Sequence, residues 1–305
     1  MKKQLLLSLM ILLWIQMEAP AQDEMVKSYS GIESVTIEGG SLEVTYQGSP
    51  DKTDIEINAY LGPEKEQEKE LVFVTMGNVL KVAYKPQQRS HNNYRGPKRY
   101  VRITGPEDME LEVKNSSGKI VVENVNSERT FLTISSGHVT ASGIGGDLVL
   151  KGSSGNIEVK DVAGSVTCSI TSGMSTIDAV EGDLSFSSTS GRLKASDIRG
   201  RVDAKLTSGS VSLNRVGELG ELALSSGNVK ATEAGLGKAT SFKGSSGSFA
   251  VTTPSDLNSF NYDLQASSGS LKVGGSSKAK RLVIQNGAST TVKGDISSGR
   301  ISIEN

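Results

Sequence analysis

The sequence has very little of the residue types that build disulfide frameworks, metal centres and sugar-stacking platforms. It holds one cysteine, Cys168, two histidines, His91 and His138, and 5% aromatic residues in a chain of 305. A lone cysteine forms no intramolecular disulfide, and it lies far from the N-terminus, where a lipid-accepting cysteine would be needed. Because no acid–base–nucleophile set and no zinc-ligand cluster emerges, we assign no catalytic residue, no metal ligand and no cofactor.

Charge of one sign is also lacking, since 33 Lys and Arg residues face 34 Asp and Glu residues. Such a balance argues against a dedicated nucleic-acid-binding protein, which needs a strong basic excess. The sequence also contains no apolar run of the roughly 18 residues that a transmembrane helix requires.

The first residues have the pattern of an export signal. Met1–Lys3 is basic, Leu5–Ile15 is apolar apart from one serine, and Ala19-Pro20-Ala21 is a small-x-small cleavage motif. This pattern predicts a signal peptide over residues 1–21, because the apolar stretch is too short to span a bilayer. We expect a mature chain that is exported to the periplasm, the outer membrane or the extracellular space; a buried N-terminal helix is the alternative.

A serine followed by glycine recurs along the C-terminal two thirds of the chain. The interval between these glycines is about 18 residues as far as Gly227 and becomes irregular after it, and internal repeats of this kind are typical of solenoids. The predicted turn glycines are Gly118, Gly137, Gly155, Gly173, Gly191, Gly209, Gly227, Gly247 and Gly269, followed by Gly287 after an asparagine and by Gly299.

Each repeat contains two short alternating segments. After Gly155, apolar residues fall at two, four and seven places, a second glycine at nine, and apolar residues again at eleven, thirteen and fifteen. Alternation of period two predicts strands with one buried face, and glycines at the corners would take φ > 0. We therefore predict an all-β chain, a single parallel β-solenoid with coils of roughly 18 residues; an antiparallel sandwich, which needs no constant period, is the alternative.

The segment before the repeats alternates as well, but without a fixed period. We interpret residues 22–112 as a β-rich cap and residues 113–305 as the solenoid, since an open solenoid end would be an adhesive sheet edge. The expected strands of the cap are Ser34–Glu38, Leu42–Tyr46, Asp54–Tyr60, Leu71–Met76, Val79–Tyr84, Arg99–Thr104 and Met109–Lys114.

The repeated Ser-Gly-x-Ile-x-Val unit and the lead-in from Arg99 to Gly118 resemble the bacterial "putative adhesin" domain family, a domain of unknown function. Autotransporter-adhesin head domains share this unit. The resemblance covers roughly residues 30–305 and implies an exported or membrane-associated β-solenoid. It supplies no catalytic or ligand residues.

Three features are candidates for a site. The aspartates Asp161, Asp178 and Asp197 are expected to form an outward column with Lys160 and Lys194, as a cation or ligand site or as a solvated face. The paired Ser and Thr residues before each glycine would form a hydroxyl ladder, which either caps its own turns or binds glycan. The basic run from Arg89 to Tyr100 is either a contact for anionic surfaces or a solvated loop.

We predict a non-enzymatic structural or adhesive protein of the cell envelope, whose partner is a surface glycan or another envelope protein. Its repeated side-chain columns would act by avidity. One alternative is a carbohydrate-active β-helix enzyme or glycan-binding module. The other is a scaffold that polymerises end to end, which an uncapped last coil over Arg300–Asn305 would favour.

Overall fold

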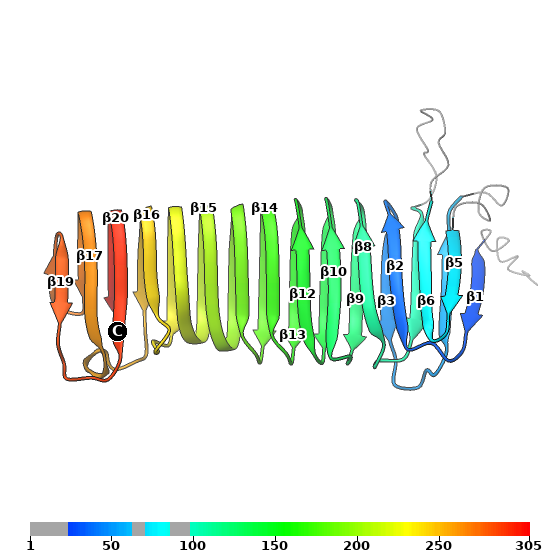
Figure 1. Cartoon of the computed structure of the whole chain (residues 1–305), viewed down its shortest axis with the longest axis horizontal. Coiled ribbons are helices and arrows are strands. Elements are labelled where there is room, and N and C mark those ends of the chain that lie inside the picture. Colours follow the sequence, from blue (N-terminus) through cyan, green and yellow to red (C-terminus); the bar gives the residue numbers. More distant parts are fainter. Residues whose placement is uncertain (1–23, 63–70, 86–97) are drawn as a thin grey trace, which may run out of the picture.

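The computed structural model describes residues 24–62, 71–85 and 98–305. The predicted signal peptide, His91 and most of the basic run from Arg89 to Tyr100 lie outside the described residues. The all-β prediction is confirmed: the described residues form one open sheet, and their one helical element is the single 3₁₀ turn η2 (Leu257–Ser259). The strands lie side by side in an elongated array (Figure 1).

The seven strands predicted before the repeats are all present, with bounds close to the predicted ones. β2 lies in parallel between β6 and β8, and β3 lies in parallel between β7 and β9. The division at residue 112 stays a prediction, but these pairings join both segments in one sheet. The seven strands are β2 (Ser34–Gly40), β3 (Glu43–Gly48), β4 (Ile55–Tyr60), β5 (Leu71–Met76), β6 (Val79–Tyr84), β7 (Tyr100–Gly105) and β8 (Glu110–Asn115), and β1 (Met25–Tyr29) is an additional strand that was not predicted.

The middle of the array follows the repeat of the sequence. Parallel partners there occupy the same position in successive repeats, as in the pairs Val166↔Leu184 and Gly173↔Gly191. The apolar positions of the alternating pattern point inward, and Cys168 is buried as predicted, in register with Phe186. The strands are β9 (Lys119–Val125), β10 (Arg129–Ile134), β11 (His138–Ile144), β12 (Asp147–Gly152), β13 (Asn156–Val162), β14 (Val166–Val180) and β15 (Leu184–Ala234).

One corner of each repeat is made by a left-handed residue that the sequence analysis missed. The three-residue step between the buried Val159 and Val162 accommodates Asp161, whose φ is 56°. A single left-handed residue lets the chain bend while both flanking apolar side chains stay inward. The same position is left-handed in seven successive repeats, at Asn124, Gly143, Asp161, Ala179, Asp197, Arg215 and Glu233.

The second glycine of each repeat does not take φ > 0, so this prediction is wrong. Gly164, Gly182 and Gly200 lie outside the left-handed region. They are glycines because the repeats approach closely at this corner: a Cβ on Gly182 would lie 2.6 Å from the carbonyl oxygen of Gly164. Real Cβ atoms do not approach backbone this closely, so the position excludes side chains.

The C-terminal end departs from sequence order. β20 (Thr291–Glu304) pairs in parallel with β16 (Ser241–Thr252) on one side and with β17 (Asn261–Val273) on the other. The outer edge is made by β18 (Ser276–Lys278) and β19 (Arg281–Ile284), both antiparallel to β17. Arg300–Asn305 does not form the uncapped last coil that would favour a scaffold, because β20 lies inside the array (Figure 1).

Candidate functional site

Ten Ser-Gly turns stack into one continuous row along the array, here called the serine–glycine ladder. A Cβ on each glycine after the first would lie within 3.2 Å of the carbonyl oxygen of the glycine before it in the row. Gly287 is not part of the ladder, since its loop leaves open space around it, and Gly299 takes the place between Gly247 and Gly269. The order in space is Gly118, Gly137, Gly155, Gly173, Gly191, Gly209, Gly227, Gly247, Gly299 and Gly269.

Positive φ is not the reason for every glycine of the ladder. Gly191, Gly247 and Gly269 lie outside the left-handed region, so the predicted conformation is wrong at these three predicted turn glycines. At Gly191 a Cβ would lie 2.6 Å from the Ser188 hydroxyl. Gly191 therefore tolerates a Cβ better than Gly173, where a Cβ would lie 2.0 Å from the carbonyl oxygen of Gly155.

The hydroxyl groups of the ladder are almost all unused by the protein itself. Two Ser or Thr residues precede each of the ten glycines, and all of these but Ser117 and Ser172 are exposed. Among these twenty side chains, only the hydroxyls of Ser154 and Ser172 form a hydrogen bond with a described residue, to each other at 3.1 Å and from Ser172 to the Ser153 carbonyl. Among the described residues none of these hydroxyls caps its own turn, contrary to the interpretation as turn caps, and almost all of them belong to exposed residues.

The three predicted aspartates do not form one column. Asp161 and Asp197 occupy the left-handed position with Ala179 between them, whereas Asp178 lies one residue earlier, in register with Lys160 and with Ser196. The register differs because Asp178 follows its glycine by five places and the other two follow theirs by six. Asp178 instead accepts a hydrogen bond from the Ser196 hydroxyl.

Asp197 is the aspartate with a charged partner. Arg215 donates to it from Nε at 2.6 Å and from Nη2 at 2.5 Å. These hydrogen bonds hold the pKa of the Asp197 carboxyl below its ordinary value. No group of three or more His, Cys, Asp or Glu side chains comes together as a metal site in the part of the chain that the structure describes.

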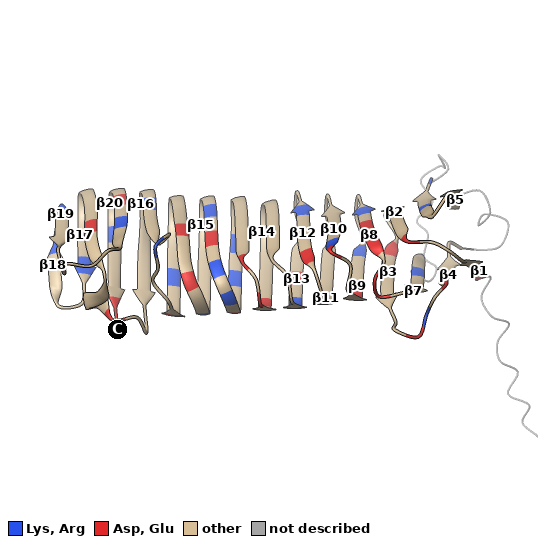
Figure 2. Cartoon of the chain, turned by 60° about the horizontal axis from the view of Figure 1, so that its bottom comes forward, with Lys and Arg blue, Asp and Glu red and all other residues tan. Residues whose placement is uncertain are grey.

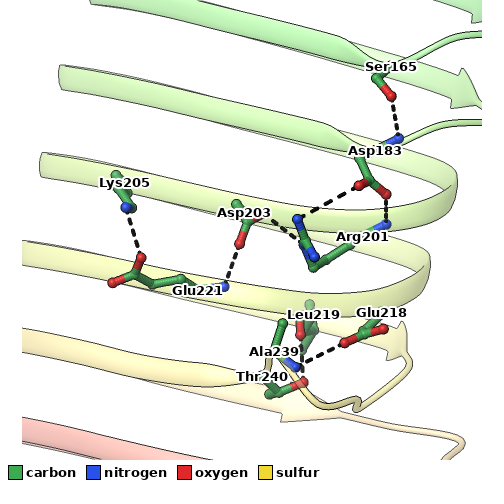
Figure 3. Close-up of polar contacts among 10 residues, drawn as sticks. All are labelled: Ser165, Asp183, Arg201, Asp203, Lys205, Glu218, Leu219, Glu221, Ala239 and Thr240. Carbon is green, nitrogen blue, oxygen red and sulfur yellow. Dashed lines mark hydrogen bonds and ion pairs between the residues drawn. The ribbon is translucent and has the colours of Figure 1, made fainter.

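Other carboxylates connect neighbouring repeats at one corner of β14 and β15 (Figure 3). Oδ1 of Asp183 accepts the backbone N–H of Arg201 at 2.7 Å, and Oδ1 of Asp203 accepts that of Glu221 at 2.7 Å. In each case a carboxylate satisfies a backbone N–H of the next repeat. In the sequence, these contacts are indicated by an aspartate that follows the ladder glycine by ten places, as Asp183 does, or by twelve, as Asp203 does.

Glu221 bridges three repeats on the outer face. Its carboxylate lies 2.8 Å from the ammonium groups of both Lys205 and Lys243. Hydrogen bonds from these two lysines lower the pKa of Glu221 to about 2. This carboxylate is therefore ionised at every physiological pH and stabilises the array rather than transferring protons.

The remaining reactive side chains have ordinary surroundings. The Cys168 thiol lies 3.8 Å from the Ser175 hydroxyl, and burial raises its pKa to about 12. A thiol that stays protonated is a poor nucleophile. The imidazole of His138 lies 3.7 Å from the carboxylate of Glu158.

The chain is similar to one protein family and to several solved structures. A family model described as Toastrack DUF4097 matches residues 32–224 and 146–304. No curated protein matches the chain. A solved "putative lipid binding protein" from Parabacteroides distasonis is 17% identical, with a TM-score of 0.44 over 91% of this chain and 96% of that chain. A "putative adhesin" from Bacteroides fragilis is 14% identical, with a TM-score of 0.38 over 93% of this chain and 98% of that chain.

The described residues contain no helix with the length and apolar character of a membrane span.

Proposed function

Because the chain belongs to the Toastrack DUF4097 family, we propose that it is an exported, non-enzymatic β-solenoid that presents an adhesive surface at the cell envelope. Each coil of the solenoid would hold about 18 residues, which suits two short strands and their turns. The constant register between successive repeats, as between Val166 and Leu184, supports the solenoid. The signal pattern of residues 1–21 supports export.

The serine–glycine ladder is the observation that carries the adhesive role. It places two hydroxyls on each of ten stacked turns, nearly all on exposed residues, and almost none of them forms a hydrogen bond with another described residue. Hydroxyl groups both donate and accept hydrogen bonds, so they suit the hydroxyls of a polysaccharide. Strands of a sheet are about 4.8 Å apart, so each contact repeats at that spacing and weak contacts add by avidity.

The end-to-end scaffold has less support than adhesion. Its basis in the sequence was an uncapped last coil, and β20 instead lies between β16 and β17. The outer edge at this end consists of the short strands β18 and β19, and the segment that holds them carries Lys278, Lys280 and Arg281. Short, positively charged edge strands oppose pairing with another sheet.

Two measurements test the proposal. Mass analysis of the N-terminus in envelope fractions should give a chain that begins at Gln22; an intact Met1 in the cytoplasm would refute export. A glycan array probed with the mature chain should give binding to polysaccharides without turnover. Release of shortened products from a bound polysaccharide would instead support the carbohydrate-active enzyme.

A further inference from the structure

A hollow of about 620 Å³ lies where the loops before β16 and before β20 meet. These loops exist because the chain leaves sequence order at this end and β20 returns beside β16. The hollow, here called the lysine hollow, is lined by Lys238, Ala239, Thr240, Ser241, Ser289, Thr290, Thr291 and Lys293.

The lysine hollow contains two ammonium groups without an anionic partner. Neither Lys238 nor Lys293 forms an ion pair with another described residue, and no carboxylate lines the hollow. By contrast, Lys243, Lys272 and Arg281 in the same region pair with Glu221, Glu304 and Asp263. Two of the unpaired lysines of this end thus line the same concave part of the surface.

Hydroxyl donors surround these lysines. Ser241, Ser289, Thr290 and Thr291 line the hollow, and their hydroxyls form no hydrogen bond with any described residue. Thr240 differs: its hydroxyl donates to the Leu219 carbonyl at 2.6 Å and so fixes the loop beside Lys238. Ammonium and hydroxyl donors around a shared space match the several acceptor oxygens of a sulfate or phosphate group.

The electrostatics of the surroundings favour an anion. Residues 235–305 contain eight Lys and Arg against four Asp and Glu, although the whole chain has a net charge of −1. Lys and Arg recur on β17, β19 and β20 at this end of the array (Figure 2). Two carboxylates lie beside the hollow and both are engaged: Glu218 accepts the N–H of Ala239 at 3.2 Å, and Asp263, in register with Lys293, faces Arg281 at 3.6 Å.

A second hollow begins two residues further along the same strands, on the same outward face. Ser241 and Lys293 are in register, as are Lys243 and Asp295 two residues further along the same strands. The next hollow, of about 560 Å³, begins there and reaches the ladder at Ser245 and Ser297. Four residues of extended strand span about 13 Å. The surface is thus long enough for several sugar units of a polymer.

We propose that the lysine hollow binds the sulfate or phosphate ester of an acidic polysaccharide, whose neighbouring sugars continue toward the ladder. The polysaccharide part of this inference rests on the proposed adhesive function, whereas binding of the oxyanion does not. Each lysine would supply a charge-assisted hydrogen bond, so its loss should weaken binding about tenfold.

The experiment compares two variants that lose the same charge. Lys238→Gln with Lys293→Gln removes both ammonium groups of the hollow. Lys278→Gln with Lys280→Gln is the matched control, because both of these lysines are exposed, unpaired among the described residues and at the same basic end. Calorimetry would measure the binding of a sulfated oligosaccharide, of inorganic phosphate and of vesicles with anionic lipids, with melting curves to verify the fold.

We expect the hollow variant to lose at least tenfold in affinity for the oligosaccharide and to lose phosphate binding, while the control changes less than threefold. Equal losses in both variants would show unspecific charge attraction and overturn the assignment. Stronger binding of vesicles than of the oligosaccharide would also overturn it, in favour of a lipid surface. If the sulfated oligosaccharide binds the wild type and both variants equally, the adhesive function stands and the lysine hollow is refuted. If phosphate alone binds at the hollow and no glycan binds, the oxyanion site stands and the adhesive function fails.

Discussion

Gly299 stacks on Gly247, although the two lie far apart in the sequence, and Gly269 stacks on the other side of Gly299. The C-terminal strand thus completes the ladder from inside the array. The N-terminal end is arranged in the same way, because the later strands β6 and β7 pair with the outer sides of the earlier strands β2 and β3. At both ends, antiparallel strands form the outer edge.

Deleting residues 291–305 removes β20 and should therefore disrupt both strands that pair with it, β16 and β17. β20 carries four fully buried side chains, Val292, Ile296, Ile301 and Ile303. Each contributes about 1.5–3 kcal/mol by burial. Hydrogen exchange should show lost protection in both β16 and β17. If β17 kept its protection by docking directly on β16, the inserted strand would not be essential.

Alanine substitutions at two ladder glycines should separate the cost of an unfavourable backbone conformation from the cost of a steric contact. Gly173 has φ 125°, and a Cβ there would meet the backbone of Gly155. Gly191 lies outside the left-handed region and would meet the side chain of Ser188, which can rotate. We expect Gly173→Ala to lower the free energy of unfolding by about 2 kcal/mol and Gly191→Ala by less than about 1 kcal/mol. Urea titrations that rank the two in the opposite order would contradict this assignment.

The sequence predicted most of the architecture because its strongest signals are local. Alternation located the strands before the repeats, and the constant spacing located the ladder glycines. The inward position of Cys168 followed from counting along one repeat, since a slip by one residue would have turned it outward. These features depend on neighbours along the chain, so they can be read without knowing the fold.

Features that depend on contacts between distant segments were predicted wrongly or missed. The place of Gly299 required knowledge that β20 returns between two earlier strands. The aspartates were counted from their glycines, but a single residue of offset placed Asp178 beside Lys160. The lysine hollow could not be predicted, because Lys238 and Lys293 are far apart in the sequence and outside the regular repeat.

The charge cluster at Glu221 should make its titration unusual. Its pKa is lowered to about 2 by Lys205 and Lys243. A carboxyl with a lowered folded pKa stabilises the fold above its ordinary pKa of 4.5, and that contribution is lost as the pH falls through about 2. Carbon-detected NMR should show the low value. It should return toward 4.5 when both lysines are replaced by glutamine, and an ordinary value in the wild type would contradict the cluster.

Calcium should have no effect on the three predicted aspartates. Asp197 is engaged by Arg215, and Asp178 by Ser196, so neither is free to bind a cation. Replacing Asp161, Asp178 and Asp197 by asparagine should leave the melting temperature equally insensitive to calcium and to chelator, as in the wild type. Loss of the Asp197 ion pair should leave the melting temperature nearly unchanged, because the pair is exposed to solvent. A calcium-dependent shift that vanishes in the variant would establish the cation site.

The serine–glycine ladder is tested most directly by removing its hydroxyls without changing the turns. One variant carries alanine at Thr189, Ser190, Thr207 and Ser208, all exposed members of the ladder. The control carries alanine at Thr167, Thr176, Ser185 and Ser212, which are exposed on other faces. Because none of these side chains is buried, both variants should melt within a few degrees of the wild type. Binding to immobilised envelope polysaccharide should fall at least tenfold in the ladder variant and stay unchanged in the control. Equal binding by the ladder variant and the wild type would contradict the adhesive function of this surface.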